Sequence, residues 1–125
     1  MGCPVQIYTG SKSTETEADF VLYKNDKRNI ENVLLVIEAK RPDKDIKNPQ
    51  YLGQVRSYAN VLKPPYYVIT NGKGIQVWQF NNPANDQIVV DIKIDDLDKE
   101  WTNLYKYISK KATIKRKNLL NKHII

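Results

Sequence analysis

One run of aliphatic residues limits the folds open to this chain more than any other feature. Val33 to Ile37 is a continuous stretch of valine, leucine and isoleucine, the pattern of a β-strand covered on both faces. The run passes directly into Glu38-Ala39-Lys40. Side chains alternate along a strand, so Glu38 and Lys40 point to one face and Ala39 to the other. The sequence therefore predicts a buried central strand that ends in a neighbouring carboxylate and ammonium group.

The strand before this run supplies a second carboxylate. The sequence predicts a strand over Ala18–Lys24, and the polar residues between the two strands predict a hairpin turn. With the turn centred on the pair 28–29, Asp19 faces Glu38 across the ladder, because opposed positions lie equally far from the turn centre. Opposed β-carbons lie roughly 5 Å apart, so two carboxylates there repel unless a cation lies between them. A divalent cation is therefore expected at this end of the hairpin.

The residue types in this cluster indicate which cation it would hold and which chemistry it would suit. Oxygen ligands without cysteine or histidine favour Mg²⁺ or Mn²⁺ over zinc. We expect Asp19, Glu38 and the backbone carbonyl of Ala39 to hold the metal, which would polarise a phosphodiester and activate a bound water. Lys40 would orient that water and stabilise charge on the phosphate. The competing interpretation is a solvated Glu-x-Lys ion pair of small energetic value, although charges after a buried run are costly unless paired or metal-bound.

A helix after this strand adds two polar candidates. Asn48 and Pro49 predict its start, as an N-cap residue and a proline at the first helical position, and it is expected to end near Leu62. The apolar residues repeat at helical spacing and are Leu52, Val55, Ala59 and Leu62. Gln54 and Tyr58 lie four positions apart, so they project together from a different face. A helix packed beside the hairpin would aim both at the metal site; the alternative is a solvated helix face.

The remaining pattern predicts further strands and two more helices. Strands are expected at Pro4–Tyr8, Tyr66–Thr70, Ile75–Phe80 and Gln87–Lys93, with a loop at Thr9–Glu17 and a tight turn at Asn71–Gly74. An amphipathic helix is expected around Leu97, Trp101, Leu104 and Ile108, with Trp78 and Trp101 at least partly buried. Beyond Lys111, a further helix is expected to pack on something outside this sequence.

These elements predict an α/β (α+β) fold with a central mixed β-sheet flanked by helices. The length of 125 residues is the usual size of one domain. We expect that domain to span residues 1–111, followed by a basic C-terminal helix or tail over residues 112–125.

Positive charge is concentrated at the C-terminal end of the chain. The net charge is +6, and no acidic residue follows Glu100. The lysines and arginine after that point are Lys106, Lys110, Lys111, Lys115, Arg116, Lys117 and Lys122. Such a surface suits a polyanion, because each neutralised phosphate releases a counterion. The alternative is a solvated basic tail.

Composition excludes several classes of protein. A single cysteine, Cys3, cannot form an internal disulfide, and with a single histidine, His123, it cannot build a structural zinc site. No apolar run approaches the length needed to cross a membrane. With no apolar signal segment in the sequence, a cytoplasmic protein is expected.

Three motifs in this order resemble those of a known nuclease family. They are Ala18–Tyr23 (ADFVLY), which contains Asp19, then Val36–Lys40 (VIEAK), then Gln54-x-x-x-Tyr58. The set resembles the PD-(D/E)xK nucleases and, more narrowly, the N-terminal nuclease domain of the restriction (R) subunit of type I restriction enzymes. The similarity covers about residues 4–80 and includes Ile69–Gly72 followed by Val77-Trp78.

The resemblance implies a restriction-endonuclease-like fold and a role for each candidate. Asp19 and Glu38 would be metal ligands, Lys40 the catalytic lysine, and Gln54 and Tyr58 accessory residues of the cleavage site. It also implies double-stranded DNA as substrate, Mg²⁺ or Mn²⁺ as cofactor, and other restriction-system subunits or a motor domain as partners. Family members usually carry a helix before the first strand, where this sequence has only three residues, so a fragment is expected.

The expected function is that of a Mg²⁺-dependent endonuclease domain that hydrolyses DNA phosphodiester bonds. The first alternative is a catalytically inactive DNA-binding or assembly module with the same fold. The second is a structural domain in which the Glu-x-Lys sequence is incidental.

Overall fold

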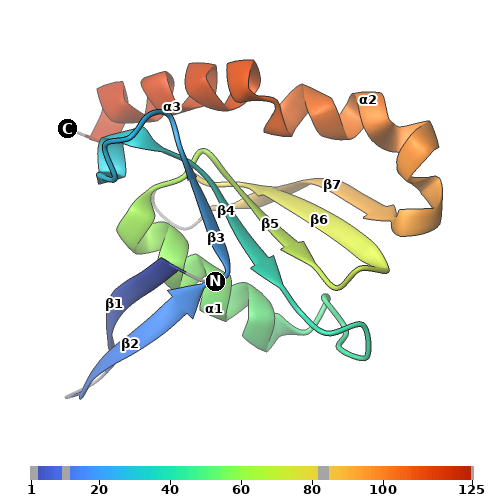
Figure 1. Ribbon diagram of the computed structural model, residues 1–125, viewed down its shortest axis with the longest axis horizontal. Helices are drawn as coiled ribbons and strands as arrows, with labels where there is room; N and C mark the ends of the chain where they lie inside the picture. Colours follow the sequence, from blue (N-terminus) through green and yellow to red (C-terminus); the bar gives the residue numbers. More distant parts are fainter. Residues whose placement is uncertain (1–2, 10–11, 82–84, 125) are drawn as a thin grey trace.

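A mixed five-stranded sheet forms the centre of the molecule (Figure 1). The computed structural model describes residues 3–9, 12–81 and 85–124. The strands are β1 (Cys3–Thr9), β2 (Lys12–Ala18), β3 (Phe20–Tyr23), β4 (Val33–Ala39), β5 (Tyr66–Thr70), β6 (Gly74–Gln79) and β7 (Gln87–Lys93). The helices are η1 (Ile30–Asn32), α1 (Pro49–Leu62), η2 (Ile94–Asp96), α2 (Leu97–Ile108) and α3 (Lys110–Ile124).

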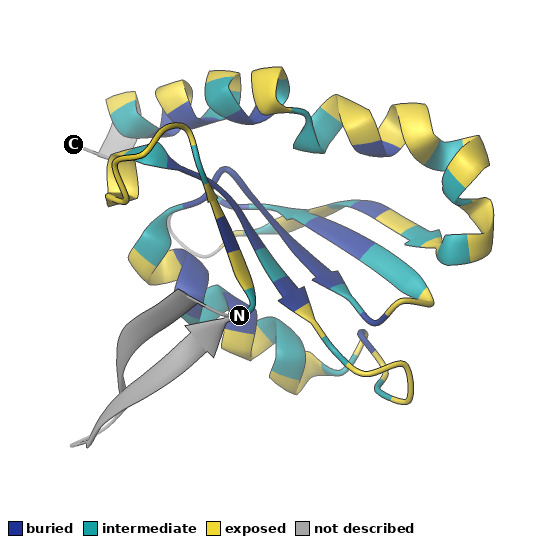
Figure 2. Ribbon diagram, in the orientation of Figure 1, coloured by how far each residue is buried: buried dark blue, intermediate teal, exposed yellow. Residues whose placement is uncertain are grey.

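The order of strands in the sheet is β3-β4-β5-β6-β7, with β4 and β5 parallel and the other neighbours antiparallel. Helix α1 packs on one face and α2 on the other, while α3 runs along the end where β4 begins (Figure 1). This is the predicted α+β fold with a central mixed sheet. The buried residues lie mainly on β4, β5 and the inner side of α1, whereas the outer sides of α2 and α3 are exposed (Figure 2).

The predicted loop at residues 9–17 is wrong, because β2 occupies most of it. β2 pairs with β1 in a separate two-stranded antiparallel sheet, with Cys3 opposite Ala18. A hairpin satisfies the backbone groups of both strands whatever their side chains are, and the threonines at 14 and 16 favour extended backbone. The polar composition therefore concealed a strand. The strand predicted at residues 4–8 is confirmed by β1.

The hairpin of β3 and β4 has the predicted register. Phe20 lies opposite Ile37 and Leu22 opposite Leu35, so the position before β3, Asp19, comes opposite Glu38. The register shifts between Leu22 and the next residue, and η1 lies in the connection. The turn is therefore more complex than a simple two-residue hairpin. The end of the hairpin away from the turn nevertheless keeps the pairing that equal spacing predicts.

The predicted boundaries of α1 are confirmed. The Asn48 side chain accepts a hydrogen bond of 3.0 Å from the backbone N–H of Gln50, and Pro49 opens the helix. Lys63 caps the C-terminus in the left-handed conformation, with φ of 52°. A stable start at Asn48 fixes which residues of α1 face the end of β4.

The turn between β5 and β6 is tied to the connection that precedes α1. The Asn71 side chain accepts hydrogen bonds from the backbone N–H groups of Lys73 and Gly74, and donates one of 2.7 Å to the Lys44 carbonyl. Gly72 has a φ of 81°, which glycine adopts without strain. These bonds hold the loops at this edge of the sheet in one arrangement beside the end of β4.

The two C-terminal helices pack on the same chain. Leu104 of α2 and Leu120 of α3 are buried in the two cores, so the prediction that the last helix packs on something outside the sequence is wrong for Leu120. Trp101 was expected to be partly buried, but it is 51% exposed, whereas Leu104 is 3% exposed. Trp78 is partly buried as predicted. The domain boundary at residue 111 falls inside α3 and stays a prediction.

Lys117 on α3 is buried to 1% exposure. Its Nζ donates a hydrogen bond to the carbonyl of Lys63. Burial, together with the nearby positive charge of Lys63, lowers the pKa of Lys117 from 10.5 to about 8, although Glu31 acts in the opposite direction.

None of the helices in the described ranges is long and apolar enough to cross a bilayer.

Candidate functional site

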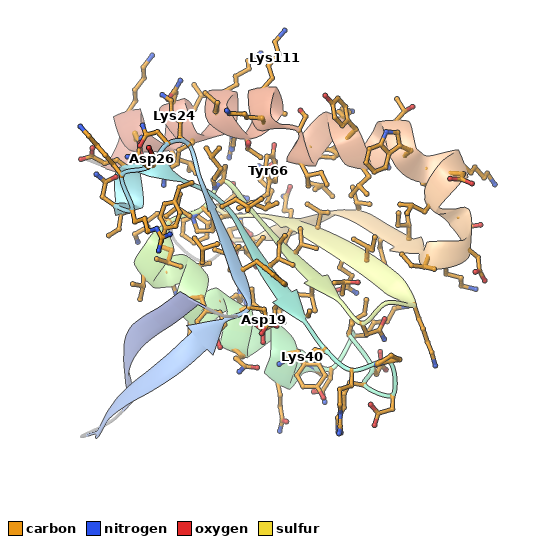
Figure 3. All side chains as sticks on the ribbon, viewed as in Figure 1. Asp19, Lys24, Asp26, Lys40, Tyr66 and Lys111 are labelled. Atoms are coloured by element: carbon orange, nitrogen blue, oxygen red, sulfur yellow. The ribbon has the colours of Figure 1, made fainter. Side chains whose placement is uncertain are left out.

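The candidate residues gather where β3 begins and β4 ends. Asp19 immediately precedes β3, and Lys40 immediately follows β4, and the two side chains lie at the same end of the sheet (Figure 3). The Asp19 Oδ2 accepts a hydrogen bond of 2.7 Å from the backbone N–H of Ala39. This bond fixes the Asp19 carboxylate against the end of β4, beside the Glu38 side chain.

Glu38 carries an incompletely compensated charge. Glu38 is only 4% exposed, and its Oε1 lies 2.9 Å from the Lys40 Nζ. Among the described residues, no hydrogen-bond donor reaches its other oxygen, Oε2, which is buried. Burial raises the pKa of Glu38, and the Asp19 carboxylate raises it further, whereas the contact with Lys40 and the backbone N–H of Asp19 lower it. The site thus has a buried carboxylate oxygen without a donor and a second carboxylate, that of Asp19, beside it.

Lys40 connects the strand to α1. Its Nζ donates a hydrogen bond of 2.9 Å to the Gln54 Oε1, and the Gln54 Nε2 donates one of 3.2 Å to the Tyr58 hydroxyl. The structure therefore brings Gln54 and Tyr58 to the same cluster as Glu38 and Lys40. The pair does not form a separate polar face, because Tyr58 is 1% exposed and belongs to the core with Val55. The separate-face prediction is wrong for Tyr58; only its hydroxyl reaches towards the site.

Tyr51 was not among the predicted residues. The Lys40 Nζ lies 4.7 Å from the centroid of its ring, within the range of a cation–π contact. Tyr51 precedes Gln54 by three positions and Tyr58 by seven, which is the spacing of one helix face. Extending the helical arithmetic by one turn towards Asn48 would have found it.

The cluster fits a hard divalent cation. The unpartnered Glu38 Oε2 could serve as an oxygen ligand, because burial deprives it of water, and the neighbouring Asp19 carboxylate adds a second charge. A group of three or more histidine, cysteine, aspartate or glutamate side chains suited to a metal does not occur within the described part of the chain. Any further ligands at this site would come from the backbone, from side chains of other types or from solvent, and the role of the Ala39 carbonyl stays a prediction.

Comparison with known proteins supports the narrower of the two resemblances seen in the motifs, that to the N-terminal region of type I restriction enzyme R subunits. A family model described as type I restriction enzyme R protein N terminus matches residues 3–94. Among solved structures, a fragment of an HsdR subunit of a type I restriction enzyme from Vibrio vulnificus YJ016 aligns at 20% identity with a TM-score of 0.45. That alignment covers 80% of this chain and 18% of the other. The search of curated proteins finds no match. Since the family model spans well over half of the residues, this chain belongs to the family of type I restriction enzyme R protein N termini.

Proposed function

We propose that this chain is a Mg²⁺- or Mn²⁺-dependent endonuclease domain of the PD-(D/E)xK type that hydrolyses phosphodiester bonds of double-stranded DNA. The observation that carries the proposal is the buried, unpartnered Glu38 Oε2 beside the Asp19 carboxylate, with the Lys40 ammonium 2.9 Å from the other Glu38 oxygen. Membership of a restriction-enzyme family supports DNA as the substrate. Other subunits of the restriction system are the proposed partners.

The charges of the cluster suit phosphodiester hydrolysis. Asp19 and Glu38 would hold the metal, with the Ala39 carbonyl as a further ligand. A divalent metal bound there supplies Lewis acidity towards a phosphoryl oxygen and lowers the pKa of a bound water. Lys40 supplies a fixed positive charge for the phosphate, and its ammonium protons can hydrogen-bond the attacking water.

The surrounding residues fix Lys40 in place. The Gln54 Oε1 accepts a hydrogen bond from the Lys40 ammonium, and the Tyr58 hydroxyl accepts one from the Gln54 Nε2 on the buried side. The Tyr51 ring covers the ammonium without neutralising it. An ammonium held by three different groups loses less conformational entropy when the phosphate arrives, so these residues act as positioning residues for Lys40.

Nicking of supercoiled plasmid DNA tests the proposal. The wild-type chain should nick in the presence of Mg²⁺ or Mn²⁺ and not in EDTA, and Lys40→Ala, Asp19→Asn and Glu38→Gln should each lose this activity. Lys111→Ala is the matched control, because Lys111 is an exposed lysine on α3. Stable DNA binding without nicking at any metal concentration would contradict the proposal and indicate the non-catalytic module.

A further inference from the structure

A second candidate site lies at the opposite end of the strands. A hollow of about 260 Å³ is lined by residues of α2, α3 and the start of β5. Tyr66 opens β5 and lines this hollow, whereas Thr70 closes β5 and its carbonyl accepts a hydrogen bond from the Lys40 N–H. Tyr66 accordingly lies well away from Asp19 and Lys40 (Figure 3). The hollow is therefore separate from the proposed cleavage site.

The hollow is positively charged. Lys106, Lys115 and Arg116 line it, and no carboxylate is among its described lining residues. Ion-pair partners for these three cations are absent from the part of the chain that the structure describes. Arg116 donates from Nη2 to the Asn81 Oδ1 at 3.0 Å, but its buried Nε finds no acceptor among the described residues. This local excess of positive charge favours binding of an anionic ligand.

The rest of the lining is aromatic and aliphatic. The rings of Tyr66 and Tyr107 meet edge to face with centroids 5.8 Å apart, and the Lys106 Nζ lies 5.3 Å from the centre of the Tyr107 ring. Leu119 is 42% exposed at the rim. The volume is below the roughly 300–1,000 Å³ of drug-sized ligand sites, so the hollow suits one planar group and not a larger molecule.

We propose that this hollow binds single-stranded DNA, with one base against Tyr107 and Leu119 and the flanking phosphates on Lys106, Lys115 and Arg116. Proteins that bind single strands combine a basic surface with aromatic rings in this way, whereas an acidic peptide would require only the cations. The inference rests on the proposed function in taking DNA as the polyanion, but it requires no cleavage. It gives the chain a second DNA contact for an unpaired nucleotide.

Fluorescence anisotropy of a labelled oligothymidylate, measured in EDTA with the full chain, tests the charges. Lys106→Gln with Lys115→Gln should reduce the slope of log affinity against log salt by about 1.4, because each lost phosphate contact on a single strand contributes about 0.7. Lys111→Gln with Lys122→Gln is the control, since it removes the same charge from exposed positions of α3 outside the hollow. Equal losses in the two double variants would overturn the proposal.

A substitution that leaves the charge unchanged tests the base contact. Tyr107→Leu should weaken oligothymidylate binding at least about fivefold, the lower end of the effect of removing a stacking ring, and Tyr107→Phe should bind like the wild type. Thermal unfolding of both variants establishes that they are folded. Unchanged binding in a folded Tyr107→Leu would overturn the proposal. So would a synthetic peptide of glutamate and leucine that binds the wild type more tightly than the oligonucleotide does.

The same measurement separates this inference from the proposed nuclease function. The effects of the Tyr107 and Lys106/Lys115 substitutions should be the same in a Lys40→Ala background as in the wild type, because Lys40 lies at the other end of the strands and distant sites contribute independently. A wild-type chain that never nicks plasmid DNA, yet shows the effects at Tyr107 and Lys115, would refute the nuclease and uphold the second site. A chain that nicks plasmid DNA but shows no such effects would uphold the nuclease and refute the second site.

Discussion

Lys40 and Lys117 are both withdrawn from solvent, but their surroundings differ. The Lys40 side chain is 16% exposed, and its ammonium contacts the Glu38 carboxylate, the Gln54 amide oxygen and the Tyr51 ring. Lys117 is 1% exposed, and its ammonium donates to one backbone carbonyl. The first charge is compensated by a carboxylate, and the second is not.

The difference shows how burial of the same side chain leads to different consequences. A buried charge costs free energy unless paired, and an unpaired lysine responds by losing its proton more readily. Lys117 does so, with its pKa lowered to about 8. Beside Lys40 it is the pKa of Glu38 that is raised, chiefly by burial, despite the ion pair between the two residues. We therefore expect Lys40 to matter for activity and Lys117 for stability.

The largest expected effect is on cleavage. Lys40→Met should reduce the rate of metal-dependent plasmid nicking by about 100-fold or more, the scale of losing one group that stabilises charge in the transition state. Lys117→Met should leave the rate unchanged, because Lys117 lies on α3, which runs along the end of the sheet where β4 begins (Figure 1). The measurement is the initial rate of loss of supercoiled plasmid. Equal losses in both variants would remove the distinction between the two lysines.

The next effect is on stability. At neutral pH, Lys117→Met should raise the free energy of unfolding by on the order of 1–2 kcal/mol, since it removes a buried charge but leaves the Lys63 carbonyl without its donor. Urea unfolding measures the change. The exposed Lys111→Met is the control and should change stability little. A destabilised Lys117→Met would mean that the hydrogen bond outweighs the charge.

The pH dependence of stability should identify the same residue. Folded Lys117 has a pKa of about 8, below its ordinary value of 10.5, so between these values the unfolded chain binds more protons. The free energy of unfolding contributed by Lys117 therefore rises as pH increases from about 8 to 10.5, and the full cost is present below that window. The difference between wild type and Lys117→Met should shrink across the window. A constant difference would show that Lys117 does not titrate there.

A comparable effect is expected from metal binding at Glu38. A ligand present at ten times its dissociation constant stabilises the folded state by about 1.4 kcal/mol, so Mg²⁺ or Mn²⁺ should raise the melting temperature of the wild type. Glu38→Gln should lose this shift, while Glu31→Gln, an exposed carboxylate on η1, should keep it. Calorimetry measures this shift in melting temperature without requiring cleavage. An equal shift in all three proteins would indicate non-specific binding.

The sequence predicted the parts of the site that depend on local periodicity. Strand parity and equal spacing from the turn correctly placed Asp19 opposite Glu38, because the register shift lies beyond Leu22, on the far side of the pairing. The start of α1 followed from Asn48 and Pro49. These features depend on a few consecutive residues and on geometry that every hairpin and helix shares.

The sequence could not show how far each helix is enclosed. Helical spacing gives the direction of a side chain but not the width of the buried arc, so Tyr58 was assigned to a polar face and Trp101 to a buried one. Lys117 likewise resembled its exposed neighbours. The depth of burial depends on where α1 and α3 meet strands distant in sequence, and no local pattern encodes that.

The smallest expected effect concerns Tyr51. Tyr51→Leu removes the ring over the Lys40 ammonium, a contact of 4.7 Å to the centroid, and such contacts are worth about 0.5–1 kcal/mol at exposed sites. We expect a two- to fivefold lower nicking rate, on the order of that energy, with little change in stability. Tyr51→Phe keeps the ring and should restore the rate, while Tyr105→Leu, an exposed tyrosine on α2, is the control. If Tyr51→Phe is as slow as Tyr51→Leu, the hydroxyl of Tyr51 and not its ring contributes to the rate, and the cation–π contact with Lys40 does not.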